Sequence, residues 1–414
     1  MDRRLWVLYF TIFVDLVGFG VFIPVMPLYA RELQASESLV GDIGALFSLM
    51  MFIFTPFWGT VSDRIGRKPV ILFSVALSAF SYVLFAHATS ILLLAISRML
   101  TGIGAGNITA AQAYITDITK PEQRAKAMGM VGAAFGMGFI FGPPLGSFLY
   151  QRYGVEWVGY TGALFCVANL VAVAFLPESL TDKVTEGKLR IKPVSGTWHA
   201  LKDVRFRDLY IISFIFIAAM SMMQMTIPFF WTDDYGLDKE QVGWMFAAVG
   251  VSSTIVQGGL VGWLQRLFGE RNMLMAGSIL MAIGLAMIAF IPLALFLPLS
   301  LLSIALLAVG NGCLNPTILA QLSRNAAQRE QGMVLGTNQS FGSLARIVGP
   351  ALGGRLYELH HGMPYITAGA IMLAALYYVH GYRGRQATAG TGPSGLTRPA
   401  GEASSSIQTT DGRG

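Results

Sequence analysis

Apolar segments of about 20 residues recur along almost the whole chain, and they limit it to one kind of fold. A helix needs about 20 apolar residues to cross a bilayer, and we predict twelve such helices. The predicted spans are residues 5–28, 41–61, 69–88, 91–116, 126–150, 157–176, 208–232, 240–263, 272–291, 294–321, 331–357 and 363–383. The ten-residue alternation typical of membrane β-barrels is absent from the sequence. Only 13% of the residues are charged, about half the share found in soluble domains. We therefore expect an all-α membrane protein.

The spans form two sets of six, which predicts two pseudo-symmetric halves. We expect an N-terminal half at 1–176, a cytoplasmic linker at 177–207, a C-terminal half at 208–385 and a disordered cytoplasmic tail at 386–414. The charged stretch 197–208 could form a short helix on the membrane surface. The tail is rich in Gly, Ser, Thr, Pro and Ala, a composition that is typical of disorder.

An internal repeat supports this division. Residues 129–147 read GMVGAAFGMGFIFGPPLGS, and residues 336–354 read GTNQSFGSLARIVGPALGG. Three glycines and a proline recur at the same displacement. A repeat of half the chain length indicates a transporter whose halves rock about a central site.

Lysine and arginine cluster at the N-terminus, in the even-numbered loops, in the linker and in the tail. The positive-inside rule then places both termini in the cytoplasm, and we expect a bacterial inner (plasma) membrane. We interpret the basic residues as topology signals and expect no nucleic-acid partner. Cys166 and Cys313 lie in apolar runs without the spacing of metal ligands, so we expect no metal site.

Asp15 lies in the apolar stretch FVDLVGFG, residues 13–20. At about 1.5 Å per residue its depth is about 15 Å, near the bilayer midplane. Acidic residues at this depth are costly and usually functional, so we predict that Asp15 exchanges a proton. The alternative is a structural carboxylate that is paired with Arg98 or hydrogen-bonded to a helix backbone. Asp42 is expected to be a helix end-cap.

Arg98 lies within the fourth span, in LAISRMLTGIGAG, residues 94–106. An unpaired charge is expensive there, which favours an orientation toward the bundle interior. The alternative is that its long side chain reaches the outer interface. In the first case Arg98 would assist Asp15 in proton coupling.

Two glycine-containing segments complete the motifs. The loop GTVSDRIGRK between spans two and three places Asp63 near three cations, where it could clasp a neighbouring helix. The loop comprises Gly59, Asp63, Arg64, Gly66, Arg67 and Lys68. The other segment, in the fifth span, comprises Gly129, Gly138, Gly142, Pro143 and Gly146. Its glycines would form a smooth packing surface and its proline would bend the helix. The alternative for the loop is that its charges are incidental and only follow the positive-inside rule. The alternative for the fifth span is that its glycines serve close packing alone.

Candidate substrate contacts are polar residues near the middle of the spans, although interhelical hydrogen bonds use the same residue types. They are Asn107, Gln112, Gln224, Gln257, Asn311, Asn315, Asn338, Gln339 and Arg346. The seventh span also carries a methionine-rich stretch, residues 220–225, which suits a promiscuous pocket or ordinary packing.

With these segments in hand, the chain resembles the major facilitator superfamily, in its twelve-span drug:proton antiporter branch, and is similar to tetracycline exporters. The resemblance rests on the first span with its acid and Pro24-x-x-Pro27, and on three motifs of that superfamily. It implies that loop 59–68 is motif A and latches the outward-facing state. It also implies that 94–106 is motif B, and that the glycines of the fifth span are the antiporter motif C, which argues for export. The third, eighth and ninth spans lack the further acids and the histidine of tetracycline exporters, which argues against tetracycline as substrate.

We therefore expect a monomeric secondary transporter that exports small amphipathic compounds or drugs in exchange for protons. The alternative is a facilitator or proton symporter for a sugar, an organic acid or a lipid-like metabolite. A membrane receptor or scaffold is a third class, which the polar mid-span residues and the repeat disfavour. No nucleotide loop, metal cluster or nucleophile motif is present in the sequence, so we expect neither an enzyme nor a cofactor, with the proton gradient as energy source.

Overall fold

The computed structural model describes residues 3–120, 123–180, 201–326 and 330–389. All regular structure in these ranges is helical. The N-terminal half contains α1 (Arg3–Glu32), α2 (Glu37–Ile65), α3 (Arg67–Ala86), α4 (Ile91–Gly104), α5 (Gly106–Ile118), α6 (Arg124–Tyr153) and α7 (Val155–Ala174). The C-terminal half contains α9 (Val204–Asp233), α10 (Lys239–Ile255), a π-helical turn (Val256–Leu260), α11 (Val261–Ile288), a 3-10 turn (Leu293–Leu295), α12 (Phe296–Asn325), α13 (Gln331–Leu359) and α14 (Met363–Ala389).

These helices give the twelve predicted spans. The helices α4 and α5 form one span with a break at Ala105, and α10 continues through the π-turn into the first part of α11. Gly269, with φ 70°, breaks α11, so that its second part is the ninth span. By length and hydropathy, nine helical segments in the described ranges could cross a membrane, and one of them, Lys239–Ile288, holds two spans. The helices α6 and α13, of 30 and 29 residues, complete the set.

Local signals explain several helix ends. Ser36 and Ser90 begin α2 and α4 by accepting hydrogen bonds from backbone amides three residues later. Asp238 and Gln241 form a reciprocal capping box at the start of α10. Gly66, with φ 121°, makes the turn between α2 and α3, where a side chain would be strained.

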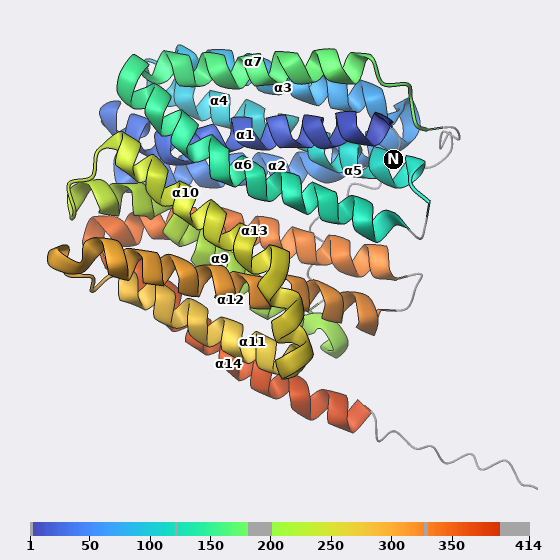
Figure 1. The fold of residues 1–414 in the computed structure, drawn as a ribbon, viewed down its shortest axis with the longest axis vertical. Coiled ribbons are helices and arrows are strands. Elements are labelled where there is room, and N and C mark those ends of the chain that lie inside the picture. The colour runs from blue at the N-terminus through green and yellow to red at the C-terminus, as the bar shows by residue number, and fades with distance from the viewer. Residues whose placement is uncertain (1–2, 121–122, 181–200, 327–329, 390–414) are drawn as a thin grey trace, which may run out of the picture.

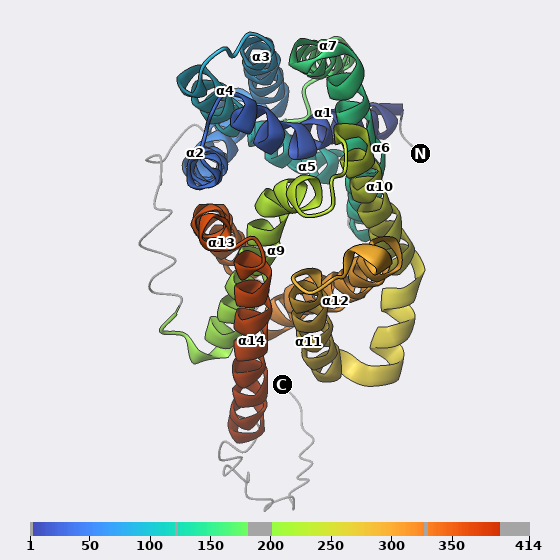
Figure 2. The ribbon, with the colours of Figure 1, turned by 90° about the vertical axis from the view of Figure 1, so that its left-hand side faces the viewer.

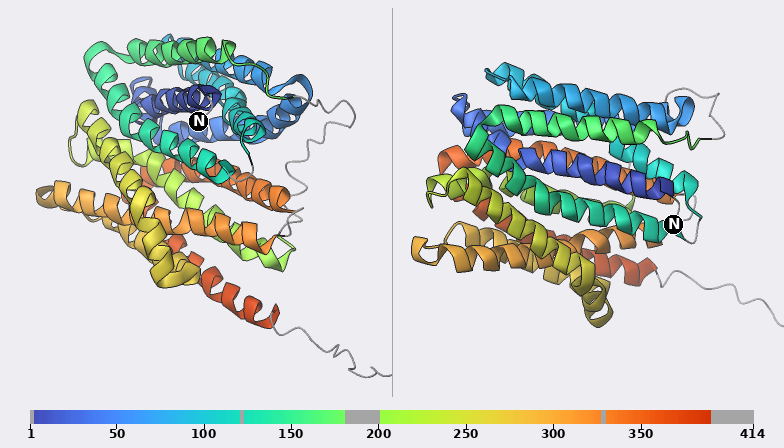
Figure 3. Two further views of the ribbon diagram at one scale, coloured as in Figure 1. Left: turned by 45° about the vertical axis from the view of Figure 1, so that its right-hand side comes forward. Right: turned by 45° about the horizontal axis from the view of Figure 1, so that its top comes forward.

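The two halves are separate groups of helices that lie side by side (Figures 1 and 2). The most extensive contacts between the halves join α2 to α13 and α6 to α10. The same arrangement is visible in the two turned views of Figure 3. Within the halves, α1 packs on α6 and α9 packs on α13, so the two helices that carry the sequence repeat, α6 and α13, have equivalent partners.

Two boundaries differ from the sequence prediction. From Val204 onward, the charged stretch 197–208 belongs to the first turns of α9 and not to a separate surface helix. The helix α14 continues to Ala389, four residues into the predicted disordered tail. Residues 181–200 and 390–414, which contain most of the linker and the tail, lie outside the described residues.

Candidate functional site

Asp15 lies midway along α1 and is half-buried, whereas its neighbours Val14 and Leu16 are buried. Its carboxylate receives a side-chain hydrogen bond from Asn107. The break at Ala105 starts a new helix there, and this places Asn107 at the second position of α5. The Asn107 side-chain oxygen accepts from the Ile108 amide at 2.7 Å, which leaves its NH₂ group for Asp15. An amide that was predicted as a substrate contact therefore holds the carboxylate.

Arg98 lies inside the N-terminal half and is 6% exposed. Its guanidinium lies over the ring of Phe22 at 4.7 Å and over that of Phe85 at 5.0 Å. Nε and Nη2 of Arg98 have no hydrogen-bond partner. Among the described residues no ion pair joins Arg98 to Asp15, so the structure does not show the pairing considered from the sequence. The two aromatic rings stabilise this buried charge in place of a carboxylate.

The predicted glycine surface of α6 packs directly on α1. A methyl group on Gly20 of α1 would meet the carbonyl oxygen of Gly138 at 2.9 Å and Cα of Gly142 at 3.1 Å. A methyl group on Gly146 would come closer still to the carbonyl oxygen of Val21. Only glycine allows this approach, and it involves the helix that carries Asp15. Gly129 lies in α6, but its surroundings are outside the described part of the chain, and Pro143 is buried in the same helix.

The loop between α2 and α3 forms ion pairs and hydrogen bonds with other parts of the N-terminal half. Arg67 pairs with Asp63 at 2.6 Å and with Asp117 of α5 at 3.2 Å. The sequence suggested that Asp63 would reach a neighbouring helix, but in the structure it pairs within its own loop, and Arg67 makes the link. Lys68 donates to the Ala174 carbonyl oxygen at 2.7 Å. Gly59, Arg64 and Gly66 lie around these contacts at the end of α2.

A largely apolar cavity lies mainly between α9, α10, α11 and α12. Gln224 and Asn311, both predicted substrate contacts, line it, and Ile23 and Phe139 close it from the N-terminal half. Its volume is about 60 Å³, whereas pockets for drug-sized ligands usually hold about 300–1,000 Å³. Asp15 is not part of its lining, so the carboxylate and the cavity are separate in this conformation.

The other predicted contacts do not line this cavity. Gln257, Asn315 and Gln339 are exposed. Asn338 is buried, and its side-chain oxygen has no partner. Gln112 and Arg346 are half-buried.

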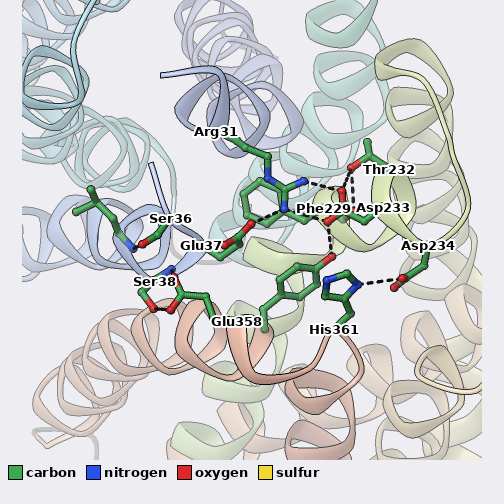
Figure 4. A network of polar contacts seen from close by, with 12 residues as sticks. Arg31, Ser36, Glu37, Ser38, Phe229, Thr232, Asp233, Asp234, Glu358 and His361 are labelled. Carbon is green, nitrogen blue, oxygen red and sulfur yellow. Dashed lines mark hydrogen bonds and ion pairs between the residues drawn. The ribbon is translucent and has the colours of Figure 1, made fainter. Parts of the chain in front are cut away.

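A network of ionic contacts joins the halves at the end of the bundle that carries the α1–α2 connection, here called the α1–α2 end (Figure 4). Arg31 of α1 pairs with Glu37 of α2 at 2.7 Å and with Asp233 of α9 at 2.6 Å. Its guanidinium also lies 4.1 Å from the ring centre of Phe229. Tyr357 of α13 donates a hydrogen bond to Asp233 at 2.9 Å. Sequence reasoning did not single out any of these residues.

Three further contacts cross between the halves at this end. Asp42 pairs with Arg355 at 2.8 Å, so it is an interhelix partner and not the predicted end-cap. Lys239 pairs with Glu32 at 2.6 Å. Ser38 donates to the carboxylate of Glu358 from its amide and its hydroxyl, and these hydrogen bonds lower the pKa of Glu358 below its ordinary value.

The opposite end, marked by Gly66 and called the α2–α3 end, lacks such contacts between the described residues of the two halves. The ion pairs found there each stay within one half. At the α1–α2 end, Gly41 of α2 lies against the Pro350 backbone of α13. At the α2–α3 end of the same two helices, a methyl group on Gly59 or Gly336 would meet nothing within 4 Å. The halves are therefore joined at one end and parted at the other.

The sequence model of the family described as Major Facilitator Superfamily matches residues 8–350 and 209–404. The chain belongs to the major facilitator superfamily. It is 31% identical over 378 residues to multidrug resistance protein 2 of Bacillus subtilis. The matched region covers 88% of this chain and 92% of that protein. It is 29% identical to the class E tetracycline resistance protein of Escherichia coli, over 91% of this chain and 94% of the relative.

The fold agrees with solved structures of such transporters. The crystal structure of the human organic anion transporter MFSD10 aligns with a TM-score of 0.70 at 23% identity, over 92% of this chain and all of that one. The protein is thus a multi-pass membrane transporter of this superfamily and not an enzyme. In a major facilitator protein, an arrangement in which the halves touch at one end and are separated at the other corresponds to one of the two states of alternating access.

Proposed function

We propose that this transporter exports small amphipathic compounds in exchange for protons. The observation that carries the proposal is the environment of Asp15, a half-buried carboxylate within the first predicted span that is held by an amide and not by a cation. Such a group can lose and regain a proton without breaking an ion pair. The names of the relatives, which refer to resistance, favour export as the direction.

The proposed cycle follows from the two ends of the bundle. We propose that both termini lie in the cytoplasm of a bacterial inner membrane, so that the α2–α3 end faces inward and this conformation corresponds to an inward-facing state. Asp15 would release its proton to the cytoplasm in this state, and substrate would then enter. After the halves rock, Asp15 would take a proton from outside as the substrate leaves. Because α6 packs on α1 without intervening side chains, a shift of α1 would be transmitted to α6 and, through it, to α10.

We propose that the substrate binds at the cavity lined by Gln224 and Asn311, which must widen to admit it. The lining is mostly apolar and aromatic, with amide and hydroxyl groups as polar points. Such a surface suits amphipathic molecules, whose apolar parts need no specific partner. We further propose that the protein acts as a monomer.

The test uses purified protein in proteoliposomes with an imposed pH gradient and a panel of amphipathic dyes and antibiotics. We expect the wild-type protein to accumulate at least one compound against its concentration gradient. Asp15→Asn keeps the size of the side chain and should still bind that compound, as measured by a thermal shift, but it should not couple transport to the gradient. Asp203→Asn, at an exposed helix start, serves as the matched control and should transport normally.

Two results would contradict the proposal. Proton-driven accumulation by Asp15→Asn would remove Asp15 from the coupling mechanism. Equilibration of substrate by the wild-type protein, without accumulation in response to the pH gradient, would instead identify a facilitator.

A further inference from the structure

Arg31 differs from the other cations that join the halves at the α1–α2 end, because it has a carboxylate partner on each side of the interface. Glu37 belongs to its own half and Asp233 to the other half. Asp233 likewise keeps partners in its own half, namely the hydroxyl group of Tyr357 at 2.9 Å and that of Thr232 at 3.3 Å, which is shared with the Phe229 carbonyl oxygen. Figure 4 shows the Arg31 side chain between the two carboxylates.

The contacts that join the halves at the α1–α2 end are here called the outer gate, a name that rests on the orientation given in the proposed function. We propose that Arg31 is the positioning residue of the outer gate and that it transfers its charge from Asp233 to Glu37 when the gate opens. In the closed gate, Arg31 is shared between the two carboxylates. In the open gate, Arg31 would keep Glu37, and Asp233 would keep Tyr357 and Thr232. Neither charge is left without a partner, so opening avoids the cost of an unpaired charge at a partly buried site.

This arrangement assigns opposite effects to the two carboxylates. Asp233 holds the gate closed, since its ion pair with Arg31 exists only in the closed state. Glu37 favours opening for two reasons. In the open state it is the sole carboxylate partner of Arg31, and in the closed state its negative charge lies close to that of Asp233. If Glu37 merely strengthened the closed gate, its loss would instead favour opening, as the loss of Asp233 does.

The experiment measures the outer gate directly by pulsed electron paramagnetic resonance on purified protein. Nitroxide labels are placed at Tyr153→Cys and Leu293→Cys, which are exposed near this end in opposite halves. All variants also carry Arg355→Gln, which removes a different ion pair between the halves and increases the open fraction. Because the samples contain no substrate and no proton gradient, the result is independent of the proposed role of Asp15.

We expect Asp233→Asn to raise the ratio of open to closed protein and Glu37→Gln to lower it, each roughly two- to fivefold, as for partly exposed ion pairs. In protein that already carries Asp233→Asn, adding Glu37→Gln should change the ratio little, because Arg31 then has no partner to exchange. Arg205→Gln serves as the matched control, since Arg205 pairs only within the C-terminal half among the described ion pairs. The control should not alter the ratio.

An increased open fraction in Glu37→Gln, or no change in it, would overturn the proposal. So would the absence of a measurable open fraction in Asp233→Asn, because the contact would then not hold the gate.

Discussion

Gly20 and Gly18 offer a matched test of the contact between α1 and α6. A methyl group on Gly20 would lie 2.9 Å from the Gly138 carbonyl oxygen and 3.1 Å from Gly142 Cα. On Gly18, one half-turn away on the same helix, the nearest atom would be Cε2 of Tyr82 at 3.9 Å, an ordinary contact distance. Backbone atoms cannot rotate aside as a side chain can, so Gly20→Ala must push the two helices apart.

The magnitude follows from these distances. Overpacking a tight interior costs about 1–3 kcal/mol, whereas replacing glycine by alanine in an unstrained helix gains about 0.4–1 kcal/mol. The gain is common to both variants, so Gly20→Ala should be less stable than Gly18→Ala by about 1–3 kcal/mol.

Thermal unfolding of purified protein, followed by tryptophan fluorescence at one heating rate, ranks the variants even where unfolding is irreversible. We expect Gly18→Ala to melt at or above the wild-type temperature and Gly20→Ala below it. Equal melting temperatures for the two variants, or the reverse order, would refute the close approach of α1 and α6.

Two further predictions concern the ends of the bundle. Glu270→Arg should break the Glu270–Arg324 pair and lower the free energy of unfolding by about 1 kcal/mol or less, because the Arg324 side chain is exposed, and the melting temperature should fall accordingly. Adding Arg324→Glu should restore the melting temperature; no restoration would mean that the pair contributes nothing. Because its contact with Ser38 lowers the pKa of Glu358, the ionised form of Glu358 stabilises the closed outer gate. This stabilisation is complete above the ordinary pKa of about 4.5, and it is lost as the pH falls through the lowered pKa. The open fraction should therefore rise on acidification below about pH 4.5, and Glu358→Gln should reduce this pH dependence relative to the wild-type protein in the same spin-label measurement.

The sequence predicted the spans and the glycine packing surface of α6 because both depend on local patterns. Apolar length gives a span whatever it packs against, and glycine spacing marks a surface that only another helix backbone can fill. The burial of Arg98 was also expected, because a charge so far inside an apolar span is costly when it faces lipid. These predictions required no knowledge of which distant residue lies opposite.

The ionic contacts of the outer gate depend on that missing knowledge. Arg31 and Asp233 are 202 residues apart, and Asp42 and Arg355 are 313 residues apart. Each is a single charge near the end of a span, where a solvated side chain is the ordinary expectation. Their pairing is decided by how the two halves meet, which no local pattern encodes. The sequence could have raised the question only by asking why charges recur at the end that the positive-inside rule leaves poor in cations.

The internal repeat preserves contacts even where it changes the residues that make them. In the N-terminal half, Arg67 follows the turn glycine Gly66 and pairs with Asp117 at the end of α5. In the C-terminal half, Glu270 follows the turn glycine Gly269 and pairs with Arg324 near the end of α12, with the charges reversed. The second loop has Arg266 in place of Asp63 and Glu270 in place of Arg67, and either order of charges in the pair gives the same attraction. The described ion pairs thus fasten each half internally at the α2–α3 end, whereas parting the α1–α2 end must break several that cross between the halves.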